Sequence, residues 1–547
     1  MKKNSFVEGT FIATFALLII KLLGAIYVIP FYSIIGEQGG ALYSYAYNVY
    51  NIFLNISTAG LPIAMSKIIS EYNAMGYFEA EHRAYKLGKN IILMLSIFAF
   101  LVLFLFAPQV SKLILGSLTG GNTIADVSFV IRSVSFCLLI IPFLSVTKGY
   151  LQGHKFISPS SNSQVIEQLV RIAVILFGSY AAINIFNTSV TTGVAVAVFG
   201  AFIGGVVAYT YLKIKIKNNK DKFPHLLPGV VDPVSSKDII KKIIKYSIPL
   251  ILVSTAIDIY TFTDMTLVLR GCYMLGYTAH ESETISSIIS SWGPKICMLI
   301  NTVATGLSVS LIPHMTDASV NKDTKEQNKR FTQAIGILIG VAFPMTVGIS
   351  ILSYPMYTVF FGPSVYGSDI LRVLVFTAFA SSVLIVVNMA LQSLNRFKII
   401  FTCTGIGLLL NALLDIPAMI FFNFIGLDAF YGAIAATIIG YSVSIVIAFA
   451  YLKHDIGFKY KEVYLIIKKA IIPILGMVCI LLLFNLFMPI NSKNPFILIL
   501  VILAYSLVGS IVYIFLGYKN GLLFDIIGKN YIDKFVNKIK HLGGKKC

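Results

Sequence analysis

A succession of long apolar runs constrains this chain more than any other feature of its sequence. A helix needs about 20 mostly apolar residues to cross a bilayer, and only helices or closed barrels satisfy their backbone polar groups there. The runs predict fourteen membrane-spanning helices, at 8–30, 41–63, 90–110, 127–147, 163–184, 190–212, 246–269, 286–312, 332–354, 370–393, 399–421, 430–452, 470–489 and 495–517. We therefore expect an all-α polytopic membrane protein.

The composition excludes a soluble enzyme. Hydrophobic residues make up 57% of the chain and charged residues only 12%, about half the roughly 25% of a typical soluble domain. The sequence contains no GxxxxGK[ST], HExxH or GxSxG pattern, and no connection long enough to form a catalytic domain. Its six cysteines form no CxxC pair. We therefore expect a transporter with no bound cofactor or metal.

The basic residues predict the topology. Lys and Arg number 43 against 24 Asp and Glu, an excess that would suggest nucleic acid in a soluble protein. Here 35 of the 43 lie in the termini and every second connection, and only 3 lie in the alternate connections. Basic residues collect on the cytoplasmic side of membrane proteins. We therefore expect both termini in the cytoplasm and no nucleic-acid partner.

The chain divides at a Lys- and Pro-containing stretch, 213–245, which we interpret as a cytoplasmic linker with a short amphipathic helix. It separates an N-terminal lobe of six spans from a C-terminal lobe of six, with a central cavity expected between them; two further spans and a basic cytoplasmic tail follow. The predicted boundaries are 1–212, 213–245, 246–452, 453–517 and 518–547.

Two short motifs recur at matching places in the two lobes. GYLQGHKF at 149–156 matches ALQSLNRF at 390–397, and AGLPIAMS at 59–66 matches VSLIPHMT at 309–316. The matches indicate two repeats in the same orientation. Repeated halves around a site near the midplane are typical of transporters.

Ionisable residues within spans are costly, so they mark candidate binding sites. Lys21 lies about 13 residues into the first span, or some 20 Å along a helix. It either faces a central cavity or extends its ammonium to the cytoplasmic surface. Lys295 follows Gly293 and Pro294 in the eighth span, where the helix should open. We expect Lys295 to contact substrate, whereas Trp292 is either a sugar-stacking ring or an interfacial aromatic.

The seventh span carries further candidates. Asp264 lies too deep to be solvated in lipid and is expected to line the cavity, paired with a cation. Arg270, near the outer end, either joins that site or anchors the span at the surface. Lys67, near the inner end of the second span, either meets an anionic headgroup or is simply a cytoplasmic charge. Glu167 and Arg171 are four residues apart, so we expect them to neutralise each other.

Several stretches together make a family resemblance. These are SIIGEQGGALYSYAYNVYNIFLNISTAGLPIAMSKIISEYNAMG, IDIYTFTDMTLVLR followed by INTVATGLSVSLIPHMTDA, and LRVLVFTAFASSVLIVVNMALQSLNRFK. They resemble the SpoVB/YtgP branch of the multidrug/oligosaccharidyl-lipid/polysaccharide (MOP) exporter superfamily, which includes the MurJ lipid II flippases. The resemblance covers about residues 1–520. It implies two six-helix lobes around a central cavity, two extra helices that shelter a lipid tail, and alternating-access export of an undecaprenyl-diphosphate-linked sugar.

The resemblance also assigns residues, with departures. The first-span motif Arg-x-Leu-Gly of the MurJ proteins is matched by Lys21-Leu22-Leu23-Gly24, and Lys lacks the two-pronged grip of Arg on phosphate oxygens. A family arginine of the eighth span falls within one residue of Lys295. Uncharged Tyr27 stands where the family has a second first-span arginine, and an acidic residue of the second span has no match near Leu42 and Tyr43. These departures follow the SpoVB/YtgP pattern.

Together these observations predict a flippase of the bacterial plasma membrane that moves an undecaprenyl-diphosphate-linked sugar outward. The first candidate substrate is the peptidoglycan precursor lipid II. Lys21, Lys295 and Arg270 would bind the diphosphate, Asp264 would tune or gate them, and Lys67 would receive the headgroup. The expected partners are the lipid-linked glycan, membrane lipids and cell-wall synthesis proteins. The energy source is left open between a coupling ion and the membrane potential.

Other functions remain as alternatives. One is export of a different lipid-linked oligosaccharide or exopolysaccharide unit. A second is a cation or drug antiporter of the same superfamily, which would need acidic residues to dominate one cavity wall. A third, a membrane-embedded glycosyltransferase, would need a catalytic carboxylate on an outer loop, where the connection 270–285 offers only Glu281 and Glu283.

Overall fold

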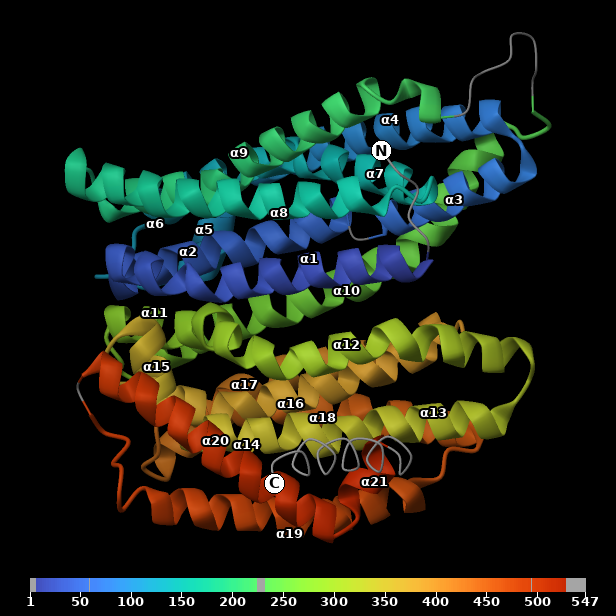
Figure 1. The fold of residues 1–547 in the computed structure, drawn as a ribbon. Coiled ribbons are helices and arrows are strands. Elements are labelled where there is room, and N and C mark those ends of the chain that lie inside the picture. The colour runs from blue at the N-terminus through green and yellow to red at the C-terminus, as the bar shows by residue number, and fades with distance from the viewer. Residues whose placement is uncertain (1–5, 59, 224–231, 493, 528–547) are drawn as a thin grey trace, which may run out of the picture. The chain divides into compact units, whose positions relative to one another are not determined.

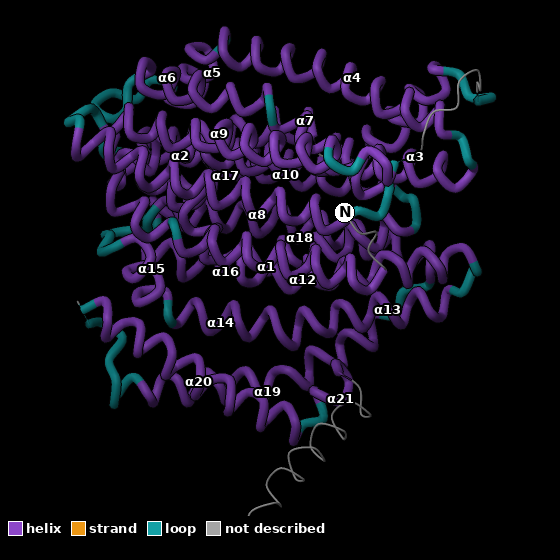
Figure 2. The backbone as a smooth tube through the Cα atoms, turned by 45° about the horizontal axis from the view of Figure 1, so that its top comes forward, coloured by secondary structure: helices purple, strands orange, loops and turns teal. Residues whose placement is uncertain are grey.

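The computed structural model describes residues 6–527 except 59, 224–231 and 493, and within this part the chain forms helices, turns and loops (Figure 2). Most of the predicted basic tail and the middle of the predicted linker lie outside the described residues. The helices group into two compact units, 1–290 and 291–547, which are treated separately below.

In its described residues, the first unit contains eleven α-helices and short 3-10 and π segments (Figure 1). Their bounds are α1 Phe6–Ile26, α2 Val28–Thr58, α3 Leu61–Met75, α4 Phe78–Leu105, α5 Ala107–Leu115, α6 Ile124–Ser135, η1 Phe136–Leu139, α7 Ile141–Gly153, α8 Ile157–Ala173, η2 Val174–Gly178, η3 Ala181–Ile185, α9 Val190–Lys217, η4 Lys220–Lys222, α10 Ser236–Met274 and α11 Ala279–Ser287.

A π-helical segment, η5 Ile288–Trp292, leads into the second unit. The second unit comprises α12 Gly293–Val320, α13 Thr324–Ile337, η6 Leu338–Ala342, α14 Phe343–Ile351, α15 Ser353–Phe361, α16 Gly367–Ser393, α17 Phe397–Phe424, α18 Ala429–Ile456, α19 Tyr460–Phe484, α20 Pro495–Lys519 and α21 Leu522–Ile527.

Helices occupy all fourteen predicted spans, which confirms the all-helical membrane fold. Twelve helical runs within the described residues are long and apolar enough to cross a bilayer. The other two predicted spans, 8–30 and 286–312, fall largely on α1 and α12. The structure also shows two connections between predicted spans. Residues 31–40 are helical, interrupted only at Gly36 (φ 66°, ψ −173°), and residues 236–245 form the start of α10 rather than the separate interfacial helix expected in the linker.

The recurring motifs at 149–156 and 390–397 fold into the same turn. Lys155 and Asn395 both take positive φ, 66° and 57°. In each turn the next backbone N–H donates to a carbonyl five residues earlier, Phe156 to Leu151 at 2.9 Å and Arg396 to Leu391 at 2.8 Å. Each turn thus closes α7 or α16 and starts the following helix, as expected if the two motifs derive from one repeat.

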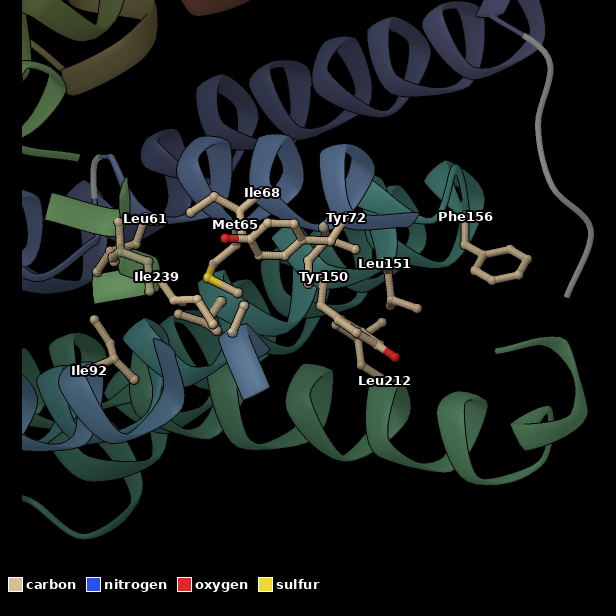
Figure 3. Close-up of a cluster of buried hydrophobic side chains, with 14 of the residues drawn as sticks. Leu61, Met65, Ile68, Tyr72, Ile92, Tyr150, Leu151, Phe156, Leu212 and Ile239 are labelled. Atoms are coloured by element: carbon tan, nitrogen blue, oxygen red, sulfur yellow. The ribbon is translucent and has the colours of Figure 1, made fainter. Parts of the chain in front are cut away.

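A hydrophobic cluster between α3, α4, α7, α9 and α10 holds these helices of the first unit together (Figure 3). Met65 and Tyr72 of α3 pack in it with Leu212 of α9. The linker takes part as well. Phe223 packs in the cluster, and the Asp232 carboxylate accepts a hydrogen bond of 2.8 Å from the backbone N–H of Ala80 in the first turn of α4.

Candidate functional site

Lys21 lies on α1, which packs along α8 in the first unit (Figure 1). Its side chain is half-buried. One turn further along α1, Gly24 lies beside α8, since a Cβ there would make an ordinary contact of 3.8 Å with Nε2 of Gln168. Lys21 therefore borders the face of α1 that approaches the polar residues of α8.

The expected neutralisation of Glu167 by Arg171 is wrong. Glu167 pairs instead with Lys148 of α7, whose Nζ lies 3.1 Å from its Oε2. The two side chains are 12% and 22% exposed, so both are largely withdrawn from solvent. Arg171 places its guanidinium over the ring of Tyr47, 5.3 Å from the ring centre. Sequence reasoning missed Lys148 because it directly follows a predicted span and so looked like a cytoplasmic loop residue.

Tyrosines of α2 form the surroundings of Arg171. Tyr43 and Tyr47 stack with ring centres 5.4 Å apart and planes 11° from parallel. Their hydroxyls, with those of Tyr27 and Tyr50, interact electrostatically with the Arg171 guanidinium. The i, i+4, i+7 spacing of the three α2 tyrosines places them on one helix face, and this signal could have been found in the sequence.

Two acidic residues, Asp258 and Asp264, lie within the membrane-spanning part of α10. Asp258 accepts a short hydrogen bond from the side-chain amide of Asn55 on α2. Asp264 is only 8% exposed, and its expected place in the cavity, paired with a cation, stays a prediction. Arg270 is half-buried and donates to the carbonyl of Leu113, in the last turn of α5. A cation at the C-terminus of a helix complements the helix dipole.

Lys67 lies far from Arg270. It is exposed on α3, and its ammonium lies 4.0 Å from the ring centre of Tyr246 near the start of α10. Tyr246 precedes Arg270 by 24 residues, or about 36 Å of helix. Lys67 and Arg270 therefore cannot hold one diphosphate together in this conformation.

Lys295 belongs to the second unit. Its ammonium lies 5.3 Å from the ring centre of Trp292, and that ring is fully buried, 5.7 Å from Phe361. A buried ring is neither an interfacial anchor nor an exposed stacking surface. The same unit buries a polar pair on α17, where the Asn411 side-chain amide donates to Asp415 at 3.2 Å.

In the first unit, Lys148 of α7 thus pairs with Glu167 of α8, Arg171 lies one turn further along α8, and Lys21 lies on α1, which packs against α8. Such an arrangement can hold an anion in an environment that excludes bulk water. Within the described part of the chain, no group of three or more His, Cys, Asp and Glu is placed to hold a metal ion.

Comparison with known proteins gives relatives along the whole chain. The family model "Polysaccharide biosynthesis protein" matches residues 6–277, and the MatE model matches 282–416. The protein named lipid II flippase MurJ of Bacillus subtilis (strain 168) is 31% identical, with 99% of this chain and 100% of the relative aligned. Stage V sporulation protein B of the same organism is 24% identical, over 64% of this chain and 65% of its own length.

Solved structures agree on the fold. A structure titled lipid II flippase MurJ, inward closed conformation, has a TM-score of 0.68 at 16% identity, covering 94% of this chain and 99% of that one. An inward-facing MATE-family multidrug transporter has a TM-score of 0.63 at 16% identity, covering 81% of this chain and 98% of that one. The chain is therefore a transporter that belongs to the MOP exporter superfamily.

Proposed function

We propose that this protein is a flippase for an undecaprenyl-diphosphate-linked sugar, with lipid II as its substrate. The observation that carries the proposal is the excess of basic over acidic side chains at Lys21, Lys148, Arg171 and Glu167 in the membrane-spanning helices of the first unit. A doubly charged diphosphate would balance this excess. The full-length relative named lipid II flippase MurJ supports the choice of substrate.

Individual residues have separate proposed roles. Lys21 and Lys295 would bind diphosphate oxygens in turn as the substrate crosses, and Asp264 would tune or gate the site. Lys67, at the inner end of α3, would receive the headgroup first. Arg270, bound to the end of α5, would act at the outer end of the path. These assignments go with the predicted topology, in which both termini are cytoplasmic.

The membrane potential would favour this direction of transport. A group of charge −2 that leaves a negative interior gains about 4.6 kcal/mol per 100 mV, at about 2.3 kcal/mol for each charge. The potential alone could therefore drive the headgroup outward.

A rescue experiment tests the proposal. The chain is expressed in a bacterium depleted of its lipid II flippase, and lipid II exposed on the outer leaflet is measured. We expect exposure to return with the wild-type chain, to fall more than tenfold in Lys21→Ala and Lys295→Ala, and to persist in Lys325→Ala, whose lysine is exposed on α13. Normal exposure in both substrate-site variants, at equal protein levels, would refute the assignment of these lysines.

A second candidate substrate is another lipid-linked oligosaccharide. The observation that favours it is Lys21 at a position where the MurJ proteins carry arginine, as in the resemblance described above. A correctly inserted chain that fails to restore lipid II exposure, but moves a different undecaprenyl-diphosphate glycan in proteoliposomes, would support this alternative. Resistance to cationic dyes on expression would point to a drug antiporter instead.

A further inference from the structure

One end of the first unit is closed by a polar interface between the α10–α11 hairpin and the helices that precede it. The Arg270 guanidinium donates to the Leu113 carbonyl, and the hydroxyls of Tyr273 and Thr119 lie 3.0 Å apart. In the predicted topology the hairpin turn, 275–278, lies outside the cell. Apolar groups are buried beside these polar contacts: Met265 of α10 and Ile285 of α11 are both 0% exposed, and the Met265 sulfur lies 3.4 Å from the Asn48 side-chain amide of α2.

Glu283 of α11 lies within this interface. It is only 1% exposed. Its Oε1 accepts a hydrogen bond of 3.0 Å from the backbone N–H of Asn122, and its Oε2 accepts one of 3.1 Å from the Asn122 side-chain amide. Gly121 makes room for the carboxyl group, since a Cβ there would lie 2.8 Å from Oε2. Asn122 is fixed in turn by donating to the carbonyl of Gln38 at 3.2 Å.

No cation balances this carboxylate. Across the described residues, Glu283 has no Lys, Arg or His within ion-pair distance. The groups that act on it are the Tyr45 hydroxyl of α2 and the Asp126 carboxylate of α6. α2 also carries Glu37, next to the Gln38 that binds Asn122. The surroundings therefore add negative rather than positive charge.

The basic group of α10 at this end is engaged elsewhere. Arg270 directs its guanidinium to the Leu113 carbonyl and the backbone around Gly116, where a Cβ would lie 3.0 Å from Nε. The other charged residue of α10 in this region, Asp264, is acidic. A buried carboxyl group in such surroundings favours its neutral, protonated form.

The pKa of Glu283 agrees with this geometry. Burial raises it from 4.5 to about 7, and Asp126 adds to the rise, while hydrogen bonds from Asn122 and Tyr45 oppose it. Glu283 precedes the predicted eighth span, 286–312. Once the hairpin separates from α2, water would reach the carboxyl group and return its pKa towards the ordinary value.

We propose that Glu283 is a proton-binding residue of the outer gate, protonated while the α10–α11 hairpin packs against α2 and deprotonated when the two separate. On opening, the carboxyl O–H bond breaks and the proton passes to water on that side; on closing, a proton returns from the same water. This inference rests on the proposed alternating-access function and on the predicted topology. It adds a proton to the groups that control the transport cycle.

The sign of the pH dependence follows from linkage. The packed state has the higher pKa and binds the proton more tightly, so acid favours packing. The equilibrium constant for opening should rise about tenfold per pH unit between pH 4.5 and about pH 7, the two pKa values of Glu283, and should level off at higher pH. Between pH 6 and pH 8 the expected increase is about tenfold.

The test measures gate opening without substrate. The background chain for this test has its six native cysteines replaced by serine. A single cysteine is then introduced on α2 by Ser44→Cys. Ser44 is fully buried, and its Oγ lies 2.9 Å from Oγ of Ser290. A membrane-impermeant maleimide is applied from outside at pH 6 to 8. The readout is the labelling rate of the chain with Glu283 divided by the labelling rate of the Glu283→Gln variant. Because ionisation of the introduced thiol changes both rates equally, its pH dependence cancels in this ratio.

We expect this ratio to rise about tenfold from pH 6 to pH 8. A ratio that does not change with pH would overturn the proposal. Glu281→Gln is the matched control, because a glutamine preserves the capping box that Glu281 forms with Thr278. The labelling rate of the Glu281→Gln variant should equal that of the chain with Glu281 and Glu283 intact at every pH.

A second variant keeps the proposal testable if Glu283→Gln does not fold. Asn122→Ala removes the amide that stabilises the carboxylate, so the midpoint of the labelling profile should shift to higher pH. An unchanged midpoint would indicate a purely structural Glu283. Labelling does not depend on transport, so the two proposals can fail separately. Labelling that depends on pH in a protein that does not flip lipid would reject only the proposed function. Flipping by a protein whose labelling is independent of pH would reject only the role of Glu283.

Discussion

The ammonium of Lys148 lies 3.1 Å from Oε2 of Glu167, and this contact between α7 and α8 leaves Arg171 to the tyrosines of α2. Because both partners are mostly buried, removing one leaves an uncompensated charge. We expect Lys148→Met and Glu167→Gln each to lower the stability by about 1–3 kcal/mol. The double variant should lose less than the sum, with a coupling energy of about 1–2 kcal/mol. Thermal unfolding in detergent measures the cycle, and strictly additive losses would contradict the pairing.

Arg171 should depend on its planar guanidinium as well as its charge. Lysine keeps the charge but cannot stack on Tyr47 in the same way, and the cation–π contact contributes about 0.5–2 kcal/mol. We expect Arg171→Met to reduce flipping in proteoliposomes more than tenfold and Arg171→Lys to reduce it several-fold. Arg372→Met is the control, since that arginine is 55% exposed at the start of α16. Equal activity of all three variants would remove Arg171 from the transport path.

The buried pair of Glu81 and His154 should stabilise the packing of α4 against α7 in the first unit. Their Oε1 and Nε2 lie 2.8 Å apart with side chains 4% and 1% exposed, and Asn73 donates to Oε2 of Glu81 at 3.1 Å. Glu81→Ala removes the charged partner of His154 and the hydrogen-bond acceptor of Asn73, so we expect a loss of about 2–4 kcal/mol.

The control on the same helix is Glu79→Ala. Glu79 pairs with Arg83 at 2.7 Å, but these side chains are 31% and 27% exposed, so its loss should stay below about 1 kcal/mol. Thermal unfolding of the two variants decides the comparison. If Glu81→Ala and Glu79→Ala lost the same stability, burial would not determine how strongly these two ion pairs stabilise the protein.

Gly149 should be irreplaceable where α7 crosses α3. A Cβ at Gly149 would lie 2.5 Å from the Pro62 carbonyl oxygen and 2.8 Å from its Cα, and backbone atoms cannot move aside as a side chain can. Gly149→Ala should therefore cost about 1–3 kcal/mol or more through overpacking. Gly405→Ala on α17 meets nothing within 4 Å and should be neutral or stabilise by up to about 1 kcal/mol. Similar melting temperatures for the two variants would disprove the close approach.

The sequence by itself determined the helical membrane fold and its family. Apolar runs of membrane length leave the backbone no alternative to helices, so all fourteen spans could be predicted. The paired motifs around Lys155 and Asn395 also predicted a repeat, because a turn with positive φ needs a local pattern that survives in both copies. Such features depend on neighbours along the chain, and these can be read from the sequence.

Only the tertiary structure decided which charges meet. Glu167 has a basic residue one helical turn away, yet it pairs with Lys148 from another helix. Glu283 looked like an outer-loop acid, but α2 and the segment around Asn122 bury it. Whether a charge is paired, solvated or protonated depends on the groups that other helices bring within a few ångströms, because electrostatic interactions are strong only at short range and away from water.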